Sequence, residues 1–302
     1  MNTRQRRSSI AAIGGASVAG LQWRLMLLWI FVTLLPTMVV ALPVWRVLDD
    51  LLGHSVHADA WARHFDGLMF GDVIAAFRND HGWTGMAFVA GMLLTWLTAP
   101  FLAGMIVAGG RAHRALDFGA LLQGGAAQYG RMLRLSFLAL IPYGLSVAAA
   151  LGASSFADDR IDAAVLASSA DWYRHGASAV ALLSFVIAQA IVESARAQFI
   201  ADFGLRSAFL ALGRGFMQFV RRPLATLFVY LAITLVGGVL LVAIAFWRGH
   251  TTATGSGLPL GMLIVQLGVI VVAWMRTARL LALAGLATAN PRRRRSDFAP
   301  AL

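Results

Sequence analysis

Cysteine and lysine are absent from the 302 residues, and glutamate occurs once, at Glu193. Without cysteine the chain has no disulfides, no thiolate metal ligands and no cysteine nucleophile. Without lysine it lacks the nucleotide-binding lysine of protein kinases, so the Asp-Phe-Gly tripeptides at Asp117 and Asp202 do not indicate a kinase magnesium site. All 25 basic residues are therefore arginine, and the net charge is +11.

Charged residues of both signs are scarce, at 13%, whereas 59% of the chain is hydrophobic, which is far from the composition of a soluble domain. A helix needs about 20 apolar residues to cross the hydrocarbon core of a bilayer. Six stretches meet this need: Leu21–Leu42, Thr84–Ala108, Leu133–Leu151, Ala177–Ser194, Pro223–Trp247 and Leu258–Met275. These long runs differ from the short alternating strands of a barrel. The sequence predicts an all-α, polytopic helical membrane bundle of about six transmembrane helices.

The arginines are distributed unevenly between alternate loops. The segments before or at the start of span one, between spans two and three, between four and five, and after span six hold 19 of the 25, while the other loops hold ten of the fourteen acids. Cytoplasmic loops retain basic residues, so both termini are predicted to be cytoplasmic. We expect a basic N-terminus at 1–20, a transmembrane domain at 21–289 and a basic tail at 290–302. Span one follows a signal-like basic start but is longer than a signal core, and we expect an uncleaved anchor.

One phrase is written twice, as RAHRALDFG from Arg111 and RAQFIADFG from Arg196, at an offset of 85 with five of nine positions identical. In each copy an apolar span ends, an arginine follows, and an aspartate (Asp117, Asp202) stands where the next helix would begin. Arg111 and Arg196 are assigned to the turns, and both aspartates to helix N-caps. Hairpins 84–151 and 177–247 would then form a parallel internal repeat, as in some transporters, with chance similarity as the alternative.

The stretch after each phrase has helical amphipathic periodicity. The first places Phe118, Leu121, Leu122, Gly125, Tyr129 and Met132 on one face, and the second places Phe209, Leu212, Phe216 and Phe219 in a stripe. We predict two cytoplasmic-side amphipathic helices that lie in the membrane interface. Arginines at such a surface attract anionic lipid. Candidate contacts are Arg206, Arg214, Arg221, Arg222, Arg292, Arg293, Arg294 and Arg295.

Glu193 lies near the inner end of span four, with Gln189 one turn earlier, and an ionisable group near lipid suggests function. A proton or cation site at Gln189 and Glu193 is one reading. The alternative is structural, with Glu193 paired to Arg196 three residues later and Gln189 bonded to a neighbouring helix. Pro100 and Pro142 lie inside spans two and three, where proline usually kinks a helix.

The outer loop LDDLLGHSVHADAWARHFD contains His54, His57 and His64 among four aspartates, so zinc binding is conceivable, although the spacing matches no compact zinc motif. An amphipathic outer helix carrying Trp61, Phe65, Leu68 and Phe77 is the preferred interpretation. No hydrolase elbow, paired zinc histidines or phosphate loop is found in the sequence. No catalytic, metal-binding or cofactor-binding residue is therefore assigned, and no cofactor is expected.

The segments LDDLLGHSVHADAWARHFDGL, FLAGMIVAGG, DFGALLQGGAAQYGRMLRL, ESARAQF and RRPLATLFVYL resemble a group of uncharacterised bacterial six-span inner-membrane proteins. That group is loosely similar to the membrane region beside some glycerophosphoryl diester phosphodiesterases. The resemblance implies a helical fold in the bacterial inner membrane. It carries over no catalytic residue, because the phosphodiesterase barrel is absent from this chain.

Three classes of function remain after this reading. We expect a non-enzymatic membrane protein that organises or handles lipid or a membrane protein partner, with the bilayer and its anionic lipids as the main partner. A small-solute transporter or channel is the alternative, and an intramembrane hydrolase comes third for want of a paired nucleophile and base. The arginines are spread over one membrane face without a nucleic-acid-binding motif, so no nucleic acid partner is expected.

Overall fold

The structure, a computed structural model, describes residues 14–53, 55–56, 67–79, 83–112, 115–162, 166–251 and 257–288. Within these ranges the regular secondary structure is helical throughout. Six helical segments are long and apolar enough to cross a membrane. The protein is therefore a multi-pass membrane protein with an all-α fold, as the sequence predicted.

The helices extend well beyond the predicted apolar spans, because the polar residues that flank each span continue the same hydrogen-bonded helix. They are α2 (Trp23–Leu52), α4 (Gly67–Asn79), α5 (Trp83–Arg111), α6 (Phe118–Leu138), α7 (Leu140–Asp162), α8 (Ala167–Ala201), α9 (Ala208–Arg221), α10 (Pro223–Gly249) and α11 (Gly257–Thr288). The largest extension is that of α8, which has 35 residues. At a rise of 1.5 Å per residue it is about 52 Å long, more than one bilayer core.

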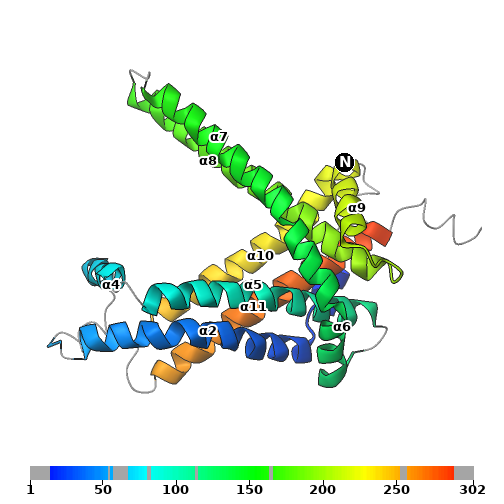
Figure 1. Ribbon diagram of the computed structural model, residues 1–302, viewed down its shortest axis with the longest axis horizontal. Coiled ribbons are helices and arrows are strands. Elements are labelled where there is room, and N and C mark those ends of the chain that lie inside the picture. Colours follow the sequence, from blue (N-terminus) through cyan, green and yellow to red (C-terminus); the bar gives the residue numbers. More distant parts are fainter. Residues whose placement is uncertain are drawn as a thin grey trace, which may run out of the picture.

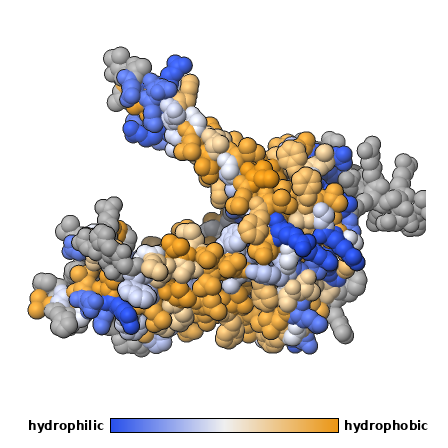
Figure 2. Space-filling view, viewed as in Figure 1, coloured by the Kyte–Doolittle hydropathy of each residue, from blue (hydrophilic) through white to orange (hydrophobic). Residues whose placement is uncertain are grey.

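The helices form a body and an arm (Figure 1). α2, α5, α10 and α11 make the body, while α7 and α8 pair as an antiparallel hairpin that leaves the body at an angle. α6 and α9 lie together at one end, which we call the α6/α9 end. The buried core is concentrated there, with Trp29, Met105, Phe199 and Leu283 among its members. The arm is apolar along its length and hydrophilic at its tip (Figure 2).

The third predicted span has a different boundary in the structure. The sequence placed it at Leu133–Leu151, but α6 runs to Leu138 and α7 starts at Leu140 after a turn at Ala139. Pro142 explains the break, since proline has no amide hydrogen to donate to the Leu138 carbonyl four residues earlier. Pro100 has a milder effect, because α5 continues through it as one helix.

Candidate functional site

Glu193 is buried inside the bundle and forms an ion pair with Arg279. The pair joins α8 to α11, with 2.9 Å between Glu193 Oε1 and Arg279 Nη2, and the two residues are 4% and 6% exposed. The sequence analysis offered an interfacial Glu193–Arg196 pair as the structural alternative. That pairing is wrong: the α8 register directs Glu193 towards α11, and its partner lies 86 residues further along the chain.

Two side chains of α10 complete the surroundings of Arg279. Its Nη1 donates to Thr234 Oγ1 at 3.1 Å, and its guanidinium lies 5.0 Å from the centre of the Tyr230 ring. Among the described residues, Glu193 Oε2 and Arg279 Nε have no hydrogen-bond partner. A buried pair of this kind is costly to break, by roughly 3–5 kcal/mol, because the remaining charge is left uncompensated. Three helices are thus fastened by one charged cluster.

Two more arginines lie within electrostatic reach of the pair, namely Arg196 of α8 and Arg276 of α11. The local charge is therefore positive, with three arginines around one carboxylate. Arg276 is exposed, unlike Arg279 one turn later. The guanidinium of Arg276 lies 5.9 Å from the ring centre of Trp29, and no hydrogen bond or ion pair joins it to another described residue. Sequence reasoning missed both α11 arginines because it ended span six at Met275 and counted them as flanking charge.

Gln189 bonds to the other helix of the arm, and not to the charged cluster. Its Oε1 accepts a hydrogen bond of 3.1 Å from the Tyr143 hydroxyl of α7. Further out, the hydroxyls of Ser146 and Ser184 are 3.2 Å apart across the same two helices. Hydrogen bonds of this kind hold helices together where there is no water to compete. This agrees with the structural reading of Gln189, as a bond to a neighbouring helix.

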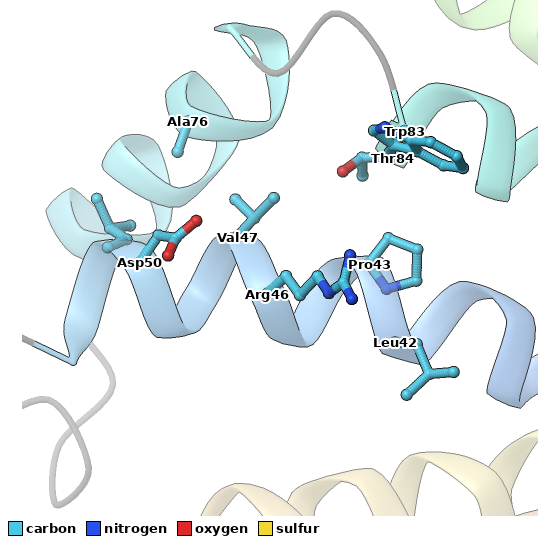
Figure 3. A pocket seen from close by; sticks show the side chains of 9 residues that line it. Leu42, Pro43, Arg46, Val47, Asp50, Ala76, Trp83 and Thr84 are labelled. Carbon is cyan, nitrogen blue, oxygen red and sulfur yellow. The ribbon is translucent and has the colours of Figure 1, made fainter.

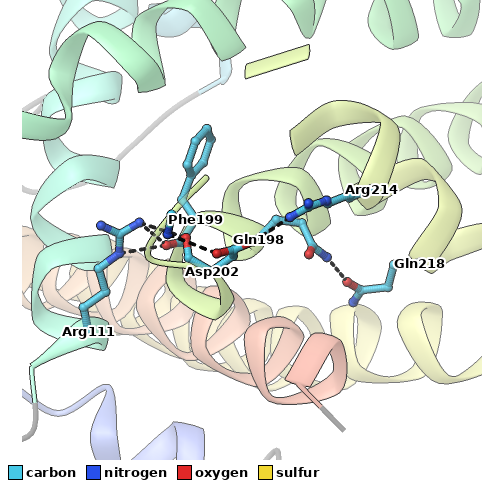
Figure 4. A network of polar contacts seen from close by, with 7 residues as sticks. Arg111, Gln198, Phe199, Asp202, Arg214 and Gln218 are labelled. Carbon is cyan, nitrogen blue, oxygen red and sulfur yellow. Dashed lines mark hydrogen bonds and ion pairs between the residues drawn. The ribbon is translucent and has the colours of Figure 1, made fainter. Parts of the chain in front are cut away.

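Arg111 links the two copies of the repeated phrase (Figure 4). It ends α5, and its Nε donates to the Phe199 carbonyl of α8 at 2.8 Å; its Nη2 also donates to that carbonyl and to the Asp202 carbonyl at 3.3 Å. These carbonyls belong to the last turn of α8, where four lack helical partners and carry partial negative charge. The arginine of the first copy therefore caps the helix that contains the second copy.

A second set of bonds ties α9 to α8, as Figure 4 shows, and also to α11. Arg214 forms an ion pair of 2.7 Å with Asp202. Gln198 Nε2 donates to Gln218 Oε1 at 2.6 Å, and Gln218 Nε2 donates to the Leu283 carbonyl at 3.2 Å. α9 is thus held by side-chain bonds from its middle and its last turn, and Arg214 is engaged within the protein.

Asp117 and Asp202 have different positions in the helices. Asp117 is the N-cap of α6 as predicted, because its Oδ1 accepts from the Ala120 amide at 2.8 Å. Asp202 is the C-cap of α8, and Ser207 caps α9 instead, so the predicted N-cap at Asp202 is wrong. Arg196 lies within α8, five residues before its end, so its assignment to a turn is also wrong. The first six residues of the second phrase, 196–201, continue α8 as a regular helix, so the turn begins only after them.

The structural repeat has an offset of 90, not the 85 of the repeated phrase. α5 and α8 end at Arg111 and Ala201, and α6 and α9 start at Phe118 and Ala208, so both connections have six residues. At this offset the matching pairs in the amphipathic helices are Leu122 and Leu212, Gly125 and Gly215, Gln128 and Gln218, and Arg131 and Arg221. Each glycine is buried against the preceding long helix, where an added Cβ would be within 3 Å of Met105 or Ala195. The shared layout is real; common ancestry of the hairpins stays a prediction.

α9 presents an apolar face away from the protein. Its small residues Ala208, Ala211 and Gly215 are buried. The exposed apolar residues form a helical stripe: Phe209, Leu210, Phe216, Met217 and Val220. The predicted stripe was therefore right for Phe209 and Phe216, whereas Leu212 and Phe219 are half-buried. Arg206 and Arg221 are exposed next to the stripe, and Arg222 is half-buried.

Several sequence predictions fall on residues outside the described ranges. These are the outer-loop histidines, the helix side chains Trp61 and Phe65, and the tail arginines Arg292–Arg295. The described residues include a helix at Gly67–Asn79, α4, in the region of the predicted outer helix. No group of three or more histidine and acidic side chains among the described residues could hold a metal ion. The zinc question at His54, His57 and His64 stays open.

No family model, curated protein or solved structure matches this chain.

Proposed function

We propose that this protein is a non-enzymatic protein of the bacterial inner membrane, with cytoplasmic termini, that organises anionic lipid at the α6/α9 end. The observation that carries the proposal is the exposed apolar stripe of α9 with Arg206 and Arg221 beside it. An amphipathic helix of this kind lies in the interface, with its apolar side chains among the acyl chains and its arginines at the headgroup level.

Charge and anchoring both support a lipid role over a purely structural one. An arginine near an anionic surface contributes about 1 kcal/mol, a factor of about five in affinity. α9 is fixed to α8 and α11 through Asp202–Arg214 and Gln218, so the stripe is held outward without needing Arg206 or Arg221. A partner in the membrane could use the same surface, and a protein partner is the second form of this proposal.

Small-solute transport through Glu193 receives less support. A transport site needs a group that the solute or a proton can reach, whereas Glu193 is 4% exposed and already neutralised by Arg279. Gln189, the second residue of the hypothetical transport site, already accepts a hydrogen bond from the Tyr143 hydroxyl with its side-chain carbonyl.

The test compares lipid selectivity at two places on the molecule. Arg206, Arg221 and Arg222 are replaced together by glutamine, and Arg214 is left alone because its loss would also free Asp202. In proteoliposomes, electron spin resonance of spin-labelled phosphatidylglycerol against phosphatidylcholine gives the relative association of the two lipids with the protein. The triple variant should lose most of the preference for phosphatidylglycerol.

The matched control replaces Arg160 and Arg174, which are exposed on the arm at the opposite end of α7 and α8. It should leave the protein's preference for phosphatidylglycerol unchanged. The proposal is wrong if the triple variant keeps the native selectivity, or if the two variants lose it equally.

A further inference from the structure

A groove runs along the seam between α2 and α5 and is closed at one end by α11. Its volume is about 670 Å³. Its lining residues are Trp29, Thr33, Pro36, Thr37, Val40, Ala41 and Val44 of α2, Phe88, Gly91, Met92, Thr95, Thr98, Ala99 and Leu102 of α5, and Val272 and Arg276 of α11. All three helices are long and apolar enough to cross a membrane, so the groove lies between membrane-crossing segments.

The single charged group of this lining is Arg276, next to Trp29 at the α6/α9 end of the groove. Arg276 makes no ion pair with any described residue. The Glu193 carboxylate attracts it from a longer distance but is paired with Arg279, and Arg196 and Arg279 add positive charge nearby. An arginine at the edge of the bilayer without a directly paired anion attracts the phosphate of an anionic lipid, by about 1 kcal/mol. The site therefore favours a bound anion at this end.

The threonines of the wall do not provide donors for an anion. Thr33 donates to the Trp29 carbonyl at 2.8 Å, Thr37 to the Thr33 carbonyl at 2.8 Å and Thr95 to the Gly91 carbonyl at 2.7 Å. Each hydroxyl hydrogen is thus used within its own helix. The wall beyond Arg276 consequently presents carbon atoms and weak acceptors, which suits an acyl chain better than a polar solute or an inorganic anion.

The dimensions suit a lipid of one leaflet. From Trp29 to Val44 the α2 wall rises about 22 Å at 1.5 Å per residue, and half of a bilayer core is about 15 Å. A second pocket of about 730 Å³ continues the seam beyond Val44, with Arg46 and Asp50 of α2 beneath Ala76 of α4 and Trp83 and Thr84 of α5 (Figure 3). There the arginine is accompanied by an acid one turn away, so the two ends of the seam differ in charge.

We infer that the α2–α5 groove holds one anionic phospholipid, with its phosphate on Arg276 and an acyl chain along the threonine-lined wall. The inference extends the proposed function, which concerns the α9 surface, and shares with it only the requirement for anionic lipid. The bound lipid neutralises Arg276 and fills the space between α2 and α5, so it acts as a structural part of the bundle.

Native mass spectrometry of the full chain tests the inference. The detergent-solubilised protein is loaded with phosphatidylglycerol or with phosphatidylcholine of the same acyl chains. The native protein should retain one phosphatidylglycerol under collisional activation that removes phosphatidylcholine. Arg276→Gln removes a charge-assisted hydrogen bond to the phosphate and should weaken this retention about tenfold, whereas Arg276→Lys should keep most of it.

Two further variants separate charge from shape. Arg46→Gln, on the same seam but at its other end, should retain phosphatidylglycerol as the native chain does. Ala41→Trp fills the groove without touching Arg276, so it should lower the retention of phosphatidylglycerol independently of Arg276→Gln. Far-UV circular dichroism checks that each variant is folded. Native retention in Arg276→Gln or Ala41→Trp, or equal losses in Arg46→Gln and Arg276→Gln, would overturn the inference.

The α9 triple variant, measured in the same way, distinguishes this inference from the proposed function. If that variant loses weakly held phosphatidylglycerol but keeps the last molecule, both stand. If only Arg276→Gln retains phosphatidylglycerol as the native chain does, the groove assignment fails and the α9 proposal stands. If only the α9 variant does so, the α9 proposal fails and the groove assignment stands.

Discussion

The buried Glu193–Arg279 pair gives the sharpest stability prediction. Replacing Glu193 by leucine removes the one carboxylate of the cluster and leaves Arg196, Arg276 and Arg279 close together without an anion. Arg279 would keep only its bond to Thr234 and its contact with Tyr230. The free energy of unfolding should fall by roughly 3–5 kcal/mol, the usual cost of breaking a buried pair from one side.

The reverse substitution should cost less, which makes the prediction specific to this site. In Arg279→Met the carboxylate of Glu193 still has Arg196 and Arg276 within electrostatic reach. We expect a loss of roughly 1–3 kcal/mol, the cost of a buried polar group that loses a partner. The double variant Glu193→Leu/Arg279→Met also removes the Arg279 guanidinium that Glu193→Leu leaves buried without an anion, so it should be more stable than Glu193→Leu alone.

The assay is reversible unfolding in mixed micelles by titration with SDS, followed by far-UV circular dichroism and tryptophan fluorescence. Asp171→Leu is the matched control, because the Asp171–Arg174 pair is exposed, at 58% and 67% of the side chains, and should contribute less than about 1 kcal/mol. Strictly additive single effects in the double-mutant cycle would refute the reasoning, since interacting partners must show a coupling energy. A Glu193→Leu variant as stable as the native chain would do the same.

Two other substitutions test the α6/α9 end. Gly215→Ala should lower the free energy of unfolding by roughly 1–3 kcal/mol, because its Cβ would lie 2.5 Å from the Ala195 nitrogen of α8. The control Gly213→Ala, whose Cβ would have nothing within 4 Å, should raise the free energy of unfolding by about 0.5–1 kcal/mol in the same titration. Equal effects of the two substitutions would contradict this packing. Arg111→Met should speed amide hydrogen exchange in the last turn of α8 about tenfold, because the capping bonds to the α8 carbonyls are lost. Arg131→Met should not, because the native Arg131 side chain bonds Gln128 of its own helix. Unchanged exchange in Arg111→Met would show that the cap does not hold α8.

Part of the candidate site was visible in the sequence because it depends on residues close together in the chain. The amphipathic pattern of α9 is local, so the helix and two residues of its exposed stripe, Phe209 and Phe216, were predicted. Leu210, Met217 and Val220 were not, and the predicted Leu212 and Phe219 are half-buried. The Asp117 cap was predicted for the same reason, because it needs only an amide three residues later.

The repeated phrase shows where a local pattern misleads. Identical letters at an offset of 85 indicated identical positions, yet α8 continues for five residues beyond Arg196 before it ends. The matching positions are offset by 90 because the lengths of helices and connections, fixed by packing, decide which residues correspond. A search for glycine, glutamine and arginine that recur with the same spacing in both amphipathic stretches would have found this offset.

By itself the sequence determined the class of protein, the six membrane-crossing segments and the two amphipathic helices, since the free energy of placing apolar residues in lipid depends on composition and periodicity alone. Only the tertiary structure decided that Glu193 pairs with Arg279, 86 residues away, that Arg111 caps a helix 88 residues away, and that Arg276 faces a lipid-sized groove. With 25 arginines available and one glutamate, charge alone could not select a partner; the rotation and contact of packed helices did.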